Sequence, residues 1–235
     1  MRARLAKRLR ILGCADFTAY LSHVESEPDR REFAELIDAL TTNKTSFLRE
    51  RSHFDFLRRA VFPTLSGPVR LWSAGCATGE EAYTLAMLAL ESFDRAAVRH
   101  IRVLATDLSQ RVLSTAVAGS YPVELLADVP VEWLQRYWTT RSMGAYEHYV
   151  AGAMLREMVR FASLNLMEPW PMQGPFDVIF CRNVMIYFDK GTQQRLVERF
   201  YGLLKPGGHL FVGHSEGLTG LSHRFRYVQP AVYVK

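Results

Sequence analysis

The sequence lacks several features that would define whole classes of protein. It has only three cysteines, Cys14, Cys76 and Cys181, which are far apart and show no CxxC or Cys/His metal-ligand spacing. A reducing compartment with free thiols is therefore expected, and no metal site is predicted. No stretch approaches the roughly 20 apolar residues of a membrane span. The basic segment 1–13 has no apolar core followed by small cleavage-site residues, so no signal peptide is predicted.

The overall composition is that of a globular protein with a core of its own. Hydrophobic residues make up 49% and charged residues 23% of the 235 residues. This length suits one large domain or a small domain joined to a larger one. The net charge of +5 permits an acidic partner, but it does not indicate nucleic acid, and we expect none. We expect a cytoplasmic protein that is not embedded in a membrane.

The first 60 residues are predicted to be mostly helical, because apolar residues recur there at helical spacing. The matching segments are residues 2–12, 17–24 and 33–40, and Glu27-Pro28-Asp29 separates the second from the third. The basic side chains that lie opposite the leucines of the first segment are Arg4, Lys7, Arg8 and Arg10. This charge run is typical of a solvated helix face. It would also suit docking on an acidic helix or on an anionic membrane surface.

From Val69 onward, strands are predicted to alternate with helices, which implies crossover connections on a largely parallel sheet. The predicted strands are residues 69–75, 101–107, 176–183 and 209–216, and the predicted helices are residues 80–93, 109–119 and 192–205. A closing hairpin is possible at residues 225–235. The pattern is weaker between Tyr121 and Asn165, where the short β-like pieces YEHYVAG and MVRFASL suggest an insertion or small subdomain.

A loop of small residues, AGCATG, joins the first predicted strand to the first long helix. It is no Walker A loop, because no Gly-Lys-Ser/Thr occurs, and a dinucleotide fingerprint would need a third glycine. Glu80 and Glu81 begin the helix that follows. Two carboxylates would repel a diphosphate but would attract a cationic ligand, such as a sulfonium with an α-ammonium group. A tight turn with helix-capping glutamates is the alternative.

Polar residues also end the next two strands. Asp107 ends the second strand, where an acidic residue usually accepts the ribose hydroxyls of a nucleoside, although it could instead cap the following helix. In FDVIFCRNVMIYFD, residues 176–189, the apolar strand stops at Arg182 and Asn183, and Tyr187 follows one turn later. Because open α/β sheets bind ligands at the carboxyl ends of central strands, we expect these residues at a ligand crevice.

Segments along essentially the whole chain resemble the chemotaxis receptor glutamate methyltransferases, the CheR-type enzymes. The matching stretches are LTTNKTSFLRE (40–50), WSAGCATGEEAYTLAM (72–87), ATDLS (105–109), SLNL (163–166), GPFDVIFCRNVMIYFD (174–189), LLKPGGHLFVGHSE (203–216) and the closing AVYVK. Members of the family transfer a methyl group from S-adenosylmethionine to glutamate side chains on the cytoplasmic helices of chemoreceptors. S-adenosylhomocysteine is the second product.

The resemblance implies an α/β fold of the Rossmann-like, S-adenosylmethionine-dependent methyltransferase type. It implies a mostly parallel seven-stranded sheet, a small N-terminal helical domain and a small β insertion. We expect the helical domain and linker at residues 1–60, the methyltransferase domain at 61–235 and the β subdomain at about 121–162. The helical domain, of the receptor-docking type, is expected to be shorter than in relatives.

The resemblance also implies which residues contact the cofactor: Asn43, Thr45, Arg49, Glu80, Asp107, Asn165, Leu166, Arg182 and Asn183. Whether Glu80 or Glu81 makes the contact stays open, and Glu80 is preferred. Catalytic roles are expected for Arg49, Asn183 and Tyr187. Arg49 would fix the cofactor or the incoming glutamate, and Tyr187 would orient the acceptor carboxylate by its hydroxyl.

Each of these catalytic roles has a structural alternative. Arg49 could only tie the helical domain to the sheet, Tyr187 could be a core aromatic, and Asn183 could cap the strand. His214 and Glu216 could line the acceptor pocket, or they could simply be solvated.

The predicted function is therefore that of a protein-glutamate O-methyltransferase in chemotaxis adaptation. It would act as a monomer on the glutamate-rich helices of membrane-bound receptors, where a basic helix could steer it electrostatically. A sensor that binds the cofactor without turnover, and a methyltransferase for another acceptor, are the alternatives. A nicotinamide oxidoreductase is disfavoured by the glycine loop.

Overall fold

The computed structural model describes residues 2–28, 31–41, 43–144 and 146–235. Its first half contains α1 (Arg2–Leu12), α2 (Phe17–Ser26), α3 (Arg31–Leu40), α4 (Arg51–Phe56), the π-helix η1 (Leu57–Val61), the 3₁₀-helix η2 (Phe62–Thr64), β1 (Val69–Ala74), α5 (Glu80–Ser92), α6 (Arg95–Val98), β2 (Ile101–Asp107) and α7 (Gln110–Ala118). Its second half contains β3 (Ser120–Pro122), η3 (Val123–Leu126), α8 (Val131–Tyr137), β4 (Trp138–Met143), β5 (Tyr146–Ala151), α9 (Ala153–Met158), β6 (Val159–Ser163), β7 (Phe176–Cys181), η4 (Met185–Tyr187), α10 (Lys190–Leu203), β8 (Leu204–Val212), β9 (Arg226–Gln229) and β10 (Val232–Val234).

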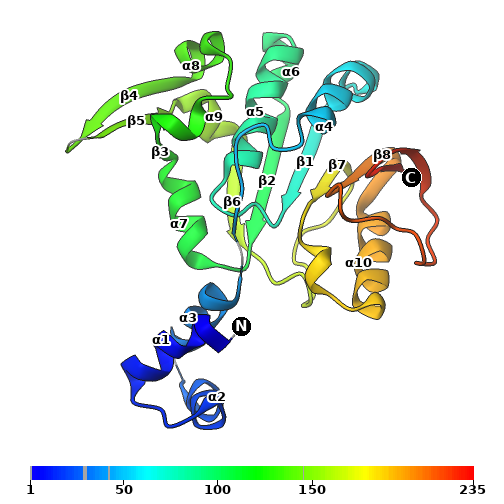
Figure 1. Cartoon of the computed structure of the whole chain (residues 1–235). Helices are drawn as coiled ribbons and strands as arrows, with labels where there is room; N and C mark the ends of the chain where they lie inside the picture. Colours follow the sequence, from blue (N-terminus) through cyan, green and yellow to red (C-terminus); the bar gives the residue numbers. More distant parts are fainter. Residues whose placement is uncertain (1, 29–30, 42, 145) are drawn as a thin grey trace.

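A seven-stranded sheet in the order β6-β2-β1-β7-β8-β10-β9 forms the centre of the molecule (Figure 1). Its first five strands are parallel, and β10 and β9 close one edge as an antiparallel hairpin. The chain places β2 on one side of β1 and β7 on the other, so the strand order reverses between β1 and β7. A reversal of this kind leaves a crevice at the carboxyl ends of the strands, which is where such sheets bind ligands. The predicted fold class is confirmed.

Strand β7 shows why this sheet is buried on both faces. All six of its residues are buried. Val178 and Phe180 pack into the core beside α5, while Ile179 and Cys181 pack on the opposite face beside α10. Since successive side chains of a strand point to opposite faces, a nearly continuous apolar run is what a doubly covered strand requires. Each fully buried large side chain contributes about 1.5–3 kcal/mol to the free energy of unfolding.

The helices α1, α2 and α3 form a separate small bundle around Leu5, Tyr20, Val24 and Leu36. A buried carboxylate, Glu32, accepts hydrogen bonds from Tyr20 Oη at 2.8 Å and from Arg8 Nε at 3.0 Å. Together, the Arg8 guanidinium and the Tyr20 hydroxyl outweigh burial and hold the pKa of Glu32 below its ordinary value.

This internal ion pair corrects the expected basic face of residues 2–12. Arg8 is directed at Glu32 and at Glu35, 3.2 Å away, rather than at a partner, while Lys7 and Arg10 are exposed. The side chain of Arg4 lies outside the described residues, as does Asp29 of the predicted break between the second and third helices.

The helical bundle lies beyond the carboxyl ends of β1 and β2, and the linker after α3 runs from it along the sheet (Figure 1). Asp38 joins the bundle to the sheet domain: it accepts a short hydrogen bond from Ser109 Oγ and pairs with Arg111 Nε at 3.4 Å. Because Ser109 caps the amino terminus of α7, these contacts hold the bundle next to the ligand-binding edge of the sheet.

The insertion differs from the expectation in one element. Strands β3, β5 and β4 form a small antiparallel sheet, as expected for a β subdomain. The segment MVRFASL, interpreted as part of that insertion, instead supplies β6, which pairs in parallel with β2 from Val103 to Asp107. The sequence of an edge strand with one solvent-facing side lacks the apolar run of a central strand. It therefore does not indicate that the strand belongs to the large sheet.

None of the helices in the described part of the chain has both the length and the hydropathy needed to cross a bilayer.

Candidate active site

The glycine loop between β1 and α5 is fixed by the backbone of β2 and by close contacts. The N–H groups of Gly75 and Cys76 both donate to the carbonyl of Thr106, at 2.8 and 2.9 Å. Gly75 has φ +87°, and a Cβ there would lie 2.4 Å from Val184 Cγ2, so only glycine fits. The loop is therefore held between the ends of β2 and β7, at the reversal of strand order.

Asp107 lies at the end of β2 beside this loop and is half-buried. Its Oδ2 accepts from the N–H of Ala77 at 2.9 Å and its Oδ1 accepts from the N–H of Ser109 at 3.0 Å. Burial raises the pKa of Asp107, and these N–H groups oppose the rise. Each carboxylate oxygen has further acceptor capacity. Asp107 thus shapes the loop, whereas Ser109 and not Asp107 caps the following helix, contrary to the capping alternative. The carboxylate of Asp107 can still accept hydroxyl groups of a sugar.

Glu80 and Glu81 have different partners although they are adjacent. Glu81 accepts from Ser73 Oγ at 2.6 Å and pairs with Arg182 Nη1 at 3.0 Å. Glu80 is 4% exposed and accepts from Thr78 Oγ1 at 2.7 and 2.9 Å, and no described basic side chain pairs with it. Burial raises its pKa. A buried carboxylate without a cation is the better candidate for a cationic ligand.

Arg182 connects the end of β7 to the linker and to α5. Its buried guanidinium donates to Glu50 Oε2 at 3.2 Å, to Glu81 Oε2 at 3.0 Å and, in a short hydrogen bond, to the carbonyl of Arg49. The side chain predicted to contact the cofactor is therefore engaged within the protein. The same contacts bring residues 49–50 directly to the end of β7.

Asn183 follows Arg182 with φ +60°, in the left-handed region that asparagine tolerates better than most residues. Its N–H donates to Glu216 Oε2 at 2.6 Å, and Glu216 also accepts from the N–H groups of Gly213, at 2.6 Å, and Ile186, at 3.1 Å. Glu216 is therefore a buried carboxylate that joins the loops after β7 and β8, rather than a solvated residue.

Tyr187 ends the short helix η4 and is 60% exposed. The alternative that it is a core aromatic is therefore wrong. Its hydroxyl is available to an incoming group at the same edge of the sheet as Asn183.

The linker lies across this edge with a strained backbone. Leu48 and Glu50 both have positive φ, +54° and +56°, and non-glycine residues in this region cluster at functional sites. Buried Phe47 stacks edge-on against Tyr121 and Trp138 and fixes the linker to the β subdomain. Arg49 Nη1 donates to the carbonyl of Lys44 at 2.6 Å, so the guanidinium of Arg49 folds back on the linker.

The remaining predicted residues lie on the linker and after β6. Asn43 and Thr45 are half-buried on the linker, and Asn43 Nδ2 donates to Thr41 Oγ1 at 3.2 Å. The N–H of Leu164 donates to the carbonyl of Asp107, which brings Asn165 and Leu166 close to Asp107. Asn165 Oδ1 accepts from the N–H of Met167 at 2.9 Å, and Leu166 is buried.

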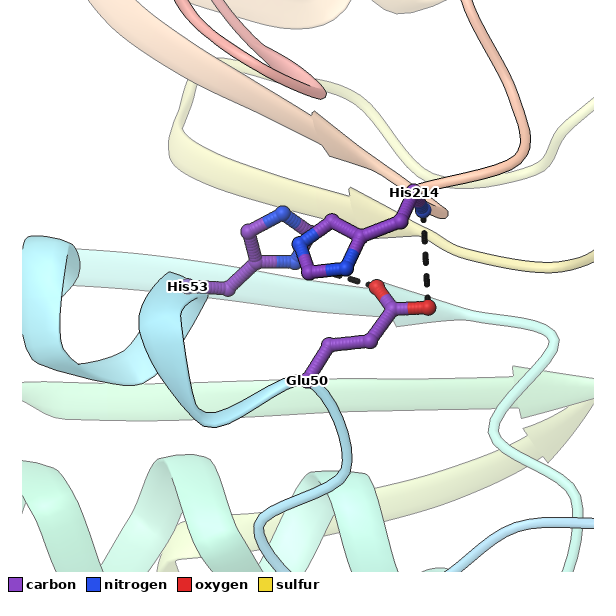
Figure 2. Close-up of side chains that lie close together, drawn as sticks. All are labelled: Glu50, His53 and His214. Atoms are coloured by element: carbon purple, nitrogen blue, oxygen red, sulfur yellow. Dashed lines mark hydrogen bonds and ion pairs between the residues drawn. The ribbon is translucent and has the colours of Figure 1, made fainter.

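Sequence reasoning missed Glu50 and His53, which meet His214 (Figure 2). Glu50 also pairs with Arg182. Arg182 and further donors outweigh burial and lower the pKa of Glu50. Burial, followed by the charge of Arg182, lowers the pKa of His53 to about 4. Glu50 precedes α4 with φ +56° and His53 lies within that helix, so no helical spacing in the sequence indicated that the two side chains meet.

These groups fit S-adenosylmethionine. Asp107 can accept hydroxyl groups of the ribose, and the buried carboxylate of Glu80 suits the α-ammonium group, while the glycine loop allows close approach of the ligand. The geometry would suit a dinucleotide poorly, because Glu80 and Glu81 begin α5, where a diphosphate would lie.

Two family models match the chain. "CheR methyltransferase, all-alpha domain" matches residues 1–41, and "CheR methyltransferase, SAM binding domain" matches residues 43–234. A chemotaxis protein methyltransferase of Escherichia coli is 44% identical over 236 residues, which are 98% of this chain and 80% of that protein. Chemotaxis protein methyltransferase 2 of Pseudomonas aeruginosa is 40% identical over 98% of this chain and 82% of its own length. A chemotaxis protein methyltransferase of Borreliella burgdorferi is 38% identical over 100% of this chain and 85% of its own length.

Proposed function

The chain belongs to the CheR methyltransferase family and is an S-adenosylmethionine-dependent methyltransferase, and we propose that it methylates glutamate side chains of chemoreceptors. The observation that carries this proposal is the meeting of two groups of residues at one sheet edge. Asp107 and Glu80 would form the cofactor half, and Asn183 and Tyr187 would form the half that faces an acceptor.

Methyl transfer to a carboxylate requires little acid–base catalysis by the protein. When bound, S-adenosylmethionine supplies an electrophilic methyl group on its sulfonium. The acceptor glutamate is already ionised near neutral pH, because its reference pKa is about 4.3, so no strong general base is needed. The chain's own residues must hold the two reactants in line and remove water from the carboxylate. Orientation of this kind contributes up to roughly 7–11 kcal/mol in favourable cases.

Each of the predicted site residues would bind a different part of the cofactor or the acceptor. Asp107 would hold the ribose and Glu80 the α-ammonium group, while Asn165 and Leu166 would lie near the adenine. Tyr187 would donate its hydroxyl to the acceptor carboxylate, and Asn183 would support the reacting centre from the end of β7. Arg49 would turn from the carbonyl of Lys44, 2.6 Å away, toward the cofactor or the acceptor when both are bound.

The receptor side of the proposal concerns where the protein acts. Receptor methylation helices that are rich in glutamate would approach the crevice past the helical bundle, whose exposed Lys7 and Arg10 would favour them electrostatically. We infer that the protein works in the cytoplasm, as a monomer, on receptors that are themselves in the membrane.

Incubation of the protein with methyl-labelled cofactor and receptor-bearing membranes tests the proposal. A glutamate methyl ester releases its label as methanol in alkali, so alkali-labile label in the receptor band is the expected result. Label that survives alkali would indicate another acceptor atom. Cofactor binding without any transfer would favour the sensor alternative.

A further inference from the structure

Three side chains that come from distant parts of the chain converge beside the candidate active site. Glu50 precedes α4, His53 lies within it and His214 follows β8, and Figure 2 shows the three side chains together. A ligand atom of each lies within 4.8 Å of the others. The rings of His53 and His214 meet edge to face, with centroids 4.6 Å apart.

His53 is the most unusual member of this cluster. Its side chain is fully buried, and neither ring nitrogen makes a hydrogen bond of regular geometry among the described residues, although the backbone of Pro230 lies close enough to raise the pKa of His53. Its Nδ1 lies 3.4 Å from Glu50 Oε2, a contact that lacks hydrogen-bond geometry. Buried polar groups in folded proteins are nearly always well paired, so a buried imidazole without a regular hydrogen bond that faces a carboxylate and a second imidazole points to a ligand.

We propose that Glu50, His53 and His214 bind a divalent transition-metal ion, with Zn²⁺ as the best-suited candidate. Two imidazoles and one carboxylate form a ligand set that Zn²⁺ accepts, and they leave a fourth position open. Because His214 is exposed, an ion can enter from solvent on its side of the cluster.

The geometry requires only a small closure. Ligand atoms about 2.0–2.2 Å from Zn²⁺ lie roughly 3.3 Å from one another. His53 Nδ1 and Glu50 Oε2 already lie 3.4 Å apart, and because all the ligand atoms lie within 4.8 Å of one another, the remaining pairs must close by at most about 1.5 Å. His214 can make this movement because it is exposed. Ser52 Oγ lies 3.3 Å from His214 Nε2 and can orient the ring by a hydrogen bond, as the outer partners of metal-binding histidines do.

The charges near the cluster allow binding but limit its strength. Arg182 lies 3.0 Å from Glu50 Oε2 and would share that carboxylate with the metal ion. Glu81 also pairs with Arg182, so two carboxylates face one guanidinium and the site stays attractive to a cation. We therefore expect a site of modest affinity, whose occupancy ties the linker to the end of β8.

Titration of the chelator-treated full chain with Zn²⁺, and separately with Co²⁺, tests this proposal. We expect wild type to bind Zn²⁺ and to give the intense visible absorption of four-coordinate Co²⁺. His214→Ala should weaken Zn²⁺ binding by at least about tenfold, because it removes a ligand rather than an outer partner. His100→Ala is the matched control, since His100 is an exposed histidine far from the cluster in sequence and outside it in space, and it should bind as wild type does.

Thermal unfolding of the same samples provides a second measurement. Added Zn²⁺ should raise the unfolding temperature of wild type and of His100→Ala, but not that of His214→Ala. A native circular-dichroism spectrum without metal shows that His214→Ala is folded. Equal Zn²⁺ affinity in wild type and His214→Ala, or no binding by wild type, overturns the proposal and leaves the proposed methyl transfer untouched.

Discussion

Glu80 is a buried carboxylate that receives a hydroxyl but no described cation. If it holds the α-ammonium group, Glu80→Gln should weaken binding of S-adenosylmethionine by about 10- to 100-fold, since a hydrogen bond to a charged group contributes roughly 1.5–3 kcal/mol. S-adenosylhomocysteine carries the same ammonium group, so its affinity should fall by a similar factor. Calorimetric titration with both nucleosides measures the change.

Glu81→Gln is the matched control for this prediction. It removes one partner of the buried Arg182 guanidinium, so it should lower the unfolding temperature of the protein. Its effect on the affinity for the cofactor should be smaller than that of Glu80→Gln. Full affinity in Glu80→Gln together with weak binding in Glu81→Gln would transfer the assignment to Glu81.

Tyr187 offers an exposed hydroxyl where the acceptor is expected. Tyr187→Phe should slow methyl transfer by about tenfold or more while cofactor affinity is kept, because the hydroxyl would bind the acceptor and not the cofactor. Single-turnover transfer and equilibrium binding, measured on the same preparation, separate the two effects. Tyr227→Phe, at another exposed tyrosine on β9, should behave as wild type. Equal transfer rates in both variants would remove Tyr187 from the mechanism.

The sequence predicted the position of Arg182 but not what its side chain does. A charged residue after an apolar strand indicates the ligand edge of a sheet, and that edge is where the structure places it. Its partners Glu50 and Glu81, by contrast, come from two other segments, and only the folded chain brings them together. For the same reason, no local pattern could join His214 to Glu50 and His53.

Helices α1, α2 and α3 depend on one buried ion pair, which makes their stability dependent on pH. The pKa of Glu32 is lowered in the folded state, so its stabilising effect is complete above the unfolded value of about 4.3 and is lost as the pH falls through the folded value. We expect the bundle to loosen below about pH 4. Hydrogen exchange of its amides, followed as a function of pH, would detect this.

The controls for this prediction use the two acidic partners of Arg8. Glu32→Gln should destabilise the bundle by roughly 1.5–3 kcal/mol near neutral pH and flatten the acid response. Glu35→Gln alters an exposed partner of Arg8, so it should cost about 1 kcal/mol or less and leave the acid response in place. An unchanged acid response in Glu32→Gln would assign the transition to another carboxylate.

Strands and helices with a strong period were predictable, and edge elements were not. The segments that form β1, α5, β2 and β7 were recognised because most of their apolar residues are buried. Burial of this kind leaves a clear pattern of apolar residues in the sequence. Strand β6 has a buried residue at its start and mostly exposed residues after it. Its membership of the large sheet follows from pairing with β2, which is a long-range contact that the segment itself does not encode.

For the molecule as a whole, Asp38 connects the helical bundle to the sheet domain through its side chain. Its carboxylate binds Ser109 and Arg111 at the start of α7. Asp38→Ala should therefore free the bundle and speed proteolysis in the linker after α3, with the sheet domain still folded. Asp94→Ala is the control, because Asp94 caps α6 and has no described contact with the bundle. Equal cleavage rates would show that other contacts hold the bundle.

The carboxylate of Glu216 receives N–H groups from residues on both loops that border the acceptor side of the crevice. It therefore ties those two loops together. Side chains such as Tyr187 can be exchanged for others along the border while the width of the opening stays the same. A protein built in this way can adopt a different substrate through changes at its rim, provided that this one acidic residue is retained.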